Sequence, residues 1–200
     1  MTARRGTMEA GQLVDDNDER MTWVLVDGEN IDATLGSQIL GRRPQPDERP
    51  RWDRLIAFTQ RAWGQYARGV FFLNASTGIP TAFVQALKAM DFVVVPLAGS
   101  PDQKIVDIAI QRTLRALVER DADVMLVSHD GDFLEDVASL VAADRRVGVA
   151  GFTEFRNIGF STLAGVEKFD LEYDARVFDA PLPRIRVIPI EEFDPASFLD

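Results

Sequence analysis

Four aspartates in this sequence lie beside apolar residues, where carboxylates are uncommon. Asp27 ends one apolar run, and Asp107 lies inside a second one. Asp130 and Asp132 follow a third run, separated by a single glycine. Carboxylates brought together out of water repel one another and lose hydration. If the fold gathers these four side chains, the site therefore requires a cation.

Each aspartate also has a purely structural explanation. Asp27 and Asp130 each precede a glycine and could be ordinary turn residues. Asp132, followed three residues later by a glutamate, resembles a helix-capping pair. Asp107 could pair with Lys104 one turn earlier, although a lysine at a helix start faces the positive end of the helix dipole. The combination of the four favours a functional site.

The available ligand types indicate which metal such a site would hold. Carboxylate oxygens without thiolates suit Mg²⁺ or Mn²⁺, which bind a few carboxylates and retain several waters. The chain has no cysteine and a single histidine, His129, so a zinc site is disfavoured. We interpret His129 as a loop residue or as a hydrogen-bond donor behind the metal ligands rather than as a general base.

The elements that must position these residues alternate regularly. Apolar runs predict strands at residues 23–26, 69–73, 92–96, 124–127 and 146–150, with 169–171 as a candidate edge strand. Helical patterns lie at 53–64, 102–120, 133–143 and 161–166, with another helix beginning at Pro80, and 36–51 is expected to be a loop. This alternation predicts an α/β fold with three αβα layers and a mostly parallel sheet of about five strands. Ligands of such sheets bind beyond the carboxyl ends of the strands, where all four aspartates fall.

Composition sets the domain organisation. Residues 1–21 are polar and predict a disordered tail, 22–174 form one domain, and 175–200 form a Pro-rich arm. We expect the arm to pack on the body, on another copy of the chain or on a protein partner. The absence of cysteines, of a secretory signal and of any apolar stretch of roughly 20 residues predicts a cytoplasmic protein without membrane association.

The charge is unevenly distributed. The net charge of −10 argues against a nucleic-acid partner, but residues 42–68 hold seven arginines against three acids. Such a segment could face phosphates, or it could lie on solvated helix surfaces. The phosphate hypothesis assigns RNA binding to Arg42, Arg43, Arg49 and Arg51.

The segments Val-Leu-Val-Asp27-Gly-Glu-Asn30, Lys104-Ile-Val-Asp107 and Val-Ser-His-Asp130-Gly-Asp132-Phe together resemble the NYN domain family, relatives of the PIN nucleases. The resemblance covers about residues 22–172. It implies a PIN-like fold, with Asp27, Asp107, Asp130 and Asp132 as metal ligands. It further implies that Asn30 fixes the first loop and that Lys104 contacts phosphate or steadies Asp107.

The resulting hypothesis is a metal-dependent endoribonuclease that hydrolyses RNA phosphodiester bonds. The alternative is a catalytically silent relative that binds RNA or protein. A third reading, phosphoryl transfer through Asp27, is disfavoured because Glu29 stands where haloacid-dehalogenase-type enzymes need a second aspartate. A receiver domain would also need a lysine after the last strand, and the segment 152–154 has none.

Overall fold

The computed structural model describes residues 20–100, 102–185, 188 and 190–199. The tail expected over residues 1–21 lies outside the described residues up to residue 19, and Met21 already begins the first strand. In chain order the strands are β1 (Met21–Asp27), β2 (Ala67–Asn74), β3 (Val93–Leu97), β4 (Ala122–Val127), β5 (Val147–Gly151) and β6 (Val166–Asp170). The helices are α1 (Gly28–Ala33), α2 (Trp52–Trp63), α3 (Thr81–Ala89), α4 (Ile105–Val118), α5 (Leu134–Ala142), α6 (Gly159–Thr162) and α7 (Ala196–Leu199). Short 3-10 turns occupy Pro46–Glu48, Gly131–Phe133 and Ile190–Glu192.

The strands form one sheet in the order β3-β2-β1-β4-β5-β6. All five neighbouring pairs are parallel. The predicted α/β class is therefore confirmed. The expected count of about five strands is corrected to six, because the candidate edge strand is real and begins earlier, at Val166.

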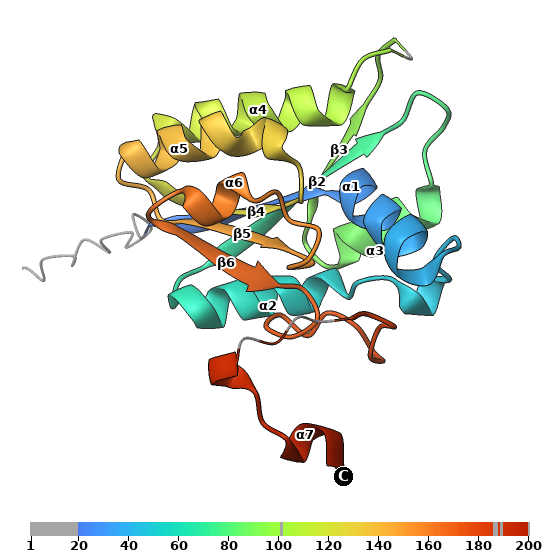
Figure 1. The fold of residues 1–200 in the computed structure, drawn as a ribbon. Helices are drawn as coiled ribbons and strands as arrows, with labels where there is room; N and C mark the ends of the chain where they lie inside the picture. Colours follow the sequence, from blue (N-terminus) through green and yellow to red (C-terminus); the bar gives the residue numbers. More distant parts are fainter. Residues whose placement is uncertain (1–19, 101, 186–187, 189, 200) are drawn as a thin grey trace, which may run out of the picture.

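Helices cover both faces of the sheet, as Figure 1 shows with α4 and α5 along one face and α2 along the other. Alternation of side chains within the strands explains the two layers. In β1, Val24 and Val26 pack with α2 and α3, whereas Leu25 packs with α4 and α5. Strands buried on both faces read as continuous apolar runs, which is why the sequence pattern identified them.

The strand order places a topological switch point between β1 and β4. From β1 the chain moves outward through β2 to β3, and α4 then returns it to the other side of β1. The loops after β1 and β4 consequently leave in opposite directions at the carboxyl edge. In open α/β sheets this opening is where ligands bind.

Two local predictions were wrong. The expected loop 36–51 is helical over its first five residues, because a π-helical segment, Thr34–Leu40, continues α1 and buries Leu35 one turn after Ile31. The expected helix 161–166 is α6, which ends at Thr162 so that Val166 can enter β6. None of the helices in the described part of the chain is long and apolar enough to cross a membrane.

Candidate metal centre at the switch point

The predicted site residues arrive at the switch point from three segments. Asp27 is the last residue of β1, Asp107 lies in the first turn of α4, and Asp130 follows β4. All three line one pocket of about 340 Å³, together with Asn30 and Lys104. The fold thus brings five of the six predicted residues to one concave surface.

Three of the carboxylates are close enough to share an ion. One ligand oxygen from each of Asp107, Asp130 and Asp132 lies within 4.8 Å of the other two. Opposite ligands of one Mg²⁺, each at about 2.1 Å, lie about 4.2 Å apart. An all-oxygen donor set at this spacing fits a hard divalent cation such as Mg²⁺ or Mn²⁺.

Lys104 already provides a counter-charge in this group. It precedes α4, and its Nζ lies 2.8 Å from Oδ2 of Asp132 and 3.5 Å from Oδ2 of Asp107. Burial raises the pKa of Asp107, Lys104 lowers it, and Asp130 raises it again, with a net upward shift. The pKa of Asp107 is therefore raised overall despite the nearby lysine, as expected for a partly buried carboxylate whose neighbours are also acidic.

Asp27 lies beside this three-acid group without belonging to it. Its side chain is buried, and both oxygens accept hydrogen bonds, from the Asn30 N–H at 3.2 Å and from the Ser128 hydroxyl at 3.0 Å. Burial raises the pKa of Asp27 to about 6; the two hydrogen bonds lower it, and Asp107 and Asp130 raise it. The three-acid group therefore does not include Asp27, whose role as a metal ligand stays a prediction.

Asn30 and His129 connect the two loops. Oδ1 of Asn30 accepts from the His129 backbone N–H at 2.9 Å and contacts its ring Nδ1 at 2.8 Å. Nε2 of the same ring accepts from the Phe152 N–H, so Nδ1 must carry the proton and donate to Asn30. Burial, with Arg156 nearby, lowers the pKa of His129 to about 4. The His129 imidazole is thus neutral, with both ring nitrogens hydrogen-bonded, and it holds the loop after β4 in place.

The capping interpretation of Asp132 was wrong, and the turn interpretation of Asp130 fits the structure. Oδ1 of Asp130 accepts from the Asp132 N–H at 2.9 Å and caps the 3-10 turn. The Asp132 side chain is instead half exposed and contacts Lys104. Asp130 can turn the loop with one oxygen and keep the other for a ligand.

Three of the four arginines assigned to RNA have carboxylate partners. Arg42 binds Glu48 through two nitrogens, Arg51 binds Asp179, and Arg49 lies 3.2 Å from Asp32. Arg43 is exposed and lines a second pocket, beside Glu29. The arginines therefore do not form one continuous basic surface, and their role stays a prediction.

Sequence analysis missed three residues of the site. Ser128 donates to Asp27 and accepts from the Asp130 N–H at 3.2 Å, which ties the two aspartates together. Asn74, at the end of β2, and Glu29 both line the acidic pocket. Asn74 could have been found by the strand-end rule that identified Asp27, whereas the role of Ser128 depends on side-chain orientation.

A three-layer parallel α/β fold with carboxylates at its switch point is the arrangement expected of the PIN-like class. The NYN domain family matches residues 21–162, and the chain belongs to this family. A solved structure of a protein of unknown function from Vibrio parahaemolyticus is similar in fold, with a TM-score of 0.59 and 18% sequence identity. That similarity covers 78% of this chain and 94% of the other. No curated protein matches the chain.

Proposed function

We propose that this chain is a Mg²⁺- or Mn²⁺-dependent ribonuclease that hydrolyses phosphodiester bonds at the acidic pocket. The observation that carries the proposal is the approach of Asp107, Asp130 and Asp132 to within 4.8 Å at the switch point of an NYN domain. These three carboxylates would hold the ion. When bound, the ion would activate water and stabilise charge on the phosphate.

The remaining residues would position this machinery. Ser128 and Asn30 fix the loops that carry Asp27 and Asp130. Lys104 is 66% exposed at the pocket, so its ammonium could turn from Asp132 to a phosphate oxygen of the substrate. The carboxylates would otherwise repel the negative strand, which makes a movable cation valuable there.

The test is cleavage of single-stranded and structured RNA with Mn²⁺ by the wild type, Asp107→Asn and Asp130→Asn. We expect each substitution to lower the rate by more than about 100-fold, beyond the loss typical of residues that only support metal ligands. Asp53→Asn is the matched control, because Asp53 is exposed in the first turn of α2. Equal rates for all four proteins would refute the proposal.

The second candidate is a catalytically silent RNA- or protein-binding regulator. The observation that favours it is Lys104, whose ammonium supplies the acids with a counter-charge without any metal. It predicts RNA binding that survives EDTA and weakens steeply with salt. Loss of binding on chelation would count against it.

A further inference from the structure

A second pocket opens directly beside the acidic one. It has a volume of about 220 Å³ and lies between α1, the start of α2 and the segment around Pro80. Glu29 lines both pockets, and Gly28, which follows Asp27, forms part of the floor. A molecule held in this pocket would therefore lie next to one bound in the acidic pocket.

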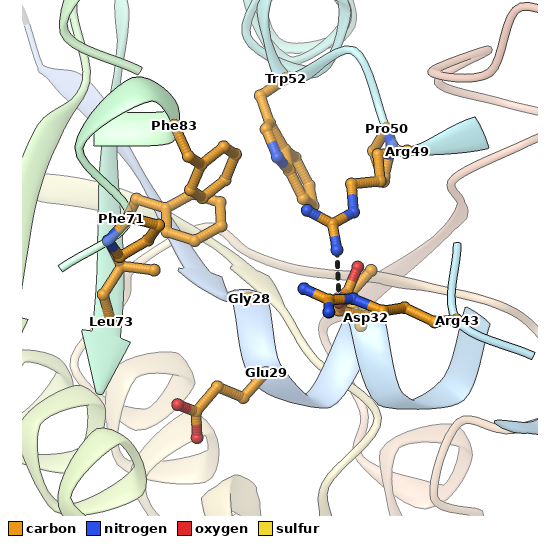
Figure 2. Close-up of a pocket in the computed structure, with 12 residues that line it drawn as sticks. Gly28, Glu29, Asp32, Arg43, Arg49, Pro50, Trp52, Phe71, Leu73 and Phe83 are labelled. Atoms are coloured by element: carbon orange, nitrogen blue, oxygen red, sulfur yellow. Dashed lines mark hydrogen bonds and ion pairs between the residues drawn. The ribbon is translucent and has the colours of Figure 1, made fainter. Parts of the chain in front are cut away.

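One wall of the pocket is aromatic. Figure 2 shows Trp52, Phe71 and Phe83 gathered on one side of the space. Phe71 packs edge-to-face against both others, with ring centroids 5.4 Å from Trp52 and 5.3 Å from Phe83. Trp52 and Phe71 are almost fully buried, whereas Phe83 is partly exposed. The buried rings of Trp52 and Phe71 thus support Phe83, whose ring is the accessible one.

The opposite wall is cationic. Figure 2 shows Arg43 and Arg49 facing the aromatic rings across the pocket. Arg43 is exposed, and Nε of Arg49 is buried without a hydrogen-bond partner although its terminal nitrogen contacts Asp32. Arg43 is thus open to a ligand, and Arg49 can reach one only through its terminal nitrogens.

We propose that this pocket holds one nucleobase of the RNA strand whose phosphate lies at the acidic pocket. The volume is below the range of about 300–1,000 Å³ typical of drug-sized ligands, so it suits a single ring system. Aromatic faces and guanidinium planes are the surfaces on which unpaired bases stack. This inference rests on the proposed ribonuclease function and adds a positioning subsite to it.

The charge distribution explains why such a subsite would be needed. The net charge of −10 and the acidic pocket itself repel a polyanion. Stacking of a base attracts the strand without depending on phosphate charge, and Arg43 adds a local cation. A base held in a duplex cannot enter unless it leaves the helix, which costs free energy.

The experiment uses a single-stranded RNA carrying one 2-aminopurine, titrated in Mn²⁺ with the Asp130→Asn protein, whose cleavage is expected to be too slow to interfere with the titration. We expect the fluorescence to change on binding, and we expect Phe83→Ala and Arg43→Gln, each added to Asp130→Asn, to weaken binding by about tenfold or more. Tyr66→Ala is the matched control, since Tyr66 is 56% exposed and lines neither pocket.

Affinities unchanged by both pocket substitutions would overturn the inference, as would equal binding of a fully paired duplex. Failure of the ribonuclease function is distinguishable, because it appears as absent Mn²⁺-dependent cleavage by the wild type. The fluorescence signal reports the pocket without requiring turnover. Phe83 is not fully buried and Arg43 is exposed, so at least the second variant should fold normally.

Discussion

At the scale of single residues, His129 works only as a neutral group. Its Nε2 accepts from the Phe152 N–H, so protonation would set one N–H against another inside the fold. Because burial lowers its pKa to about 4, from about 6.5 in an unfolded chain, the folded state loses stability as the pH falls through that interval.

We predict that the stability advantage of the wild type over His129→Gln shrinks by about 2 kcal/mol between pH 7 and pH 5. Denaturant unfolding at both pH values measures it. The comparison with His129→Gln cancels other groups, including Asp27, whose raised pKa has the opposite sign and costs stability as the pH rises. A constant difference between the two proteins would contradict the role assigned to the imidazole.

Asp27 presents the reverse situation, a buried acid whose charge the metal-free protein tolerates poorly. Its side chain is 2% exposed and lies near Asp107 and Asp130. Without added metal at pH 8, Asp27→Asn should raise the free energy of unfolding by on the order of 1 kcal/mol, because removal of the buried charge outweighs the hydrogen bond lost where the amide NH₂ replaces one accepting oxygen. The same variant should lose most cleavage.

Thermal unfolding with EDTA and cleavage with Mn²⁺ measure the two effects separately. Stability and activity that fall together would mean that Asp27 is a structural residue. The expected result, higher stability with lower activity, is common where a residue is kept for function at a cost in stability.

At the scale of elements, the site depends on how closely α1 approaches β2. A Cβ at Gly28 would lie 2.3 Å from Cε1 of Phe71, so only glycine fits there. We predict that Gly28→Ala lowers stability by about 1–3 kcal/mol, as overpacking does, and weakens metal-dependent cleavage by displacing Asp27. Denaturant unfolding and cleavage with Mn²⁺ measure both effects.

A compensating substitution tests the cause. Phe71→Leu removes the ring that the new methyl group would strike, so the double variant should be less destabilised than the sum of the single variants. Additive losses would place the strain elsewhere.

The elements that the sequence predicted well are those whose patterns are local. Parallel strands are continuous apolar runs, even in the half-exposed edge strand β3, so all five expected strands were found, as were Asp27 and Asp130 after β1 and β4. The helical segment after Asp27 was missed because Gly36 and the arginine- and proline-rich residues beyond it suggested a loop. Its helicity comes from burial of Ile31 and Leu35 in the core, which is a tertiary effect.

The same distinction holds within the site. Strand ends place Asp27 and Asp130 at one edge from sequence alone. That Asp27 uses both oxygens on Asn30 and Ser128, and that Lys104 bridges two acids, depends on side-chain orientation, which no linear pattern encodes.

At the scale of the whole molecule, the segment after β6 is tied to the body by Arg184. Its side chain is 1% exposed and pairs with Glu154, Asp170 at 2.7 Å and Glu172 at 2.9 Å. Burial alone would raise the pKa of Asp170, but Arg184 and backbone N–H groups hold it below its usual range. The cluster is thus a charged anchor inside the fold.

We predict that Arg184→Leu destabilises the protein by about 3–5 kcal/mol, since it leaves buried carboxylates unpaired. The loss should diminish below about pH 4, where those carboxylates gain protons. Arg42→Leu, which breaks an exposed pair with Glu48, should cost much less. Equal losses in the free energy of unfolding for the two variants would show that Arg184 stabilises the fold no more than an exposed ion pair does.

The anchor also bears on where the folding unit ends. Ala175 and Val177 are buried in the core cluster with α2, the Arg51 N–H donates to the Val177 carbonyl, and Arg184 closes the segment. We therefore expect a chain ending at residue 174, the predicted domain boundary, to unfold at a markedly lower temperature than the full chain. A chain ending at residue 185 keeps all of these contacts and should match the full chain in melting temperature. If the shorter chain were equally stable, residues 175–184 would be an appendage, and a role for them in binding a partner would gain weight.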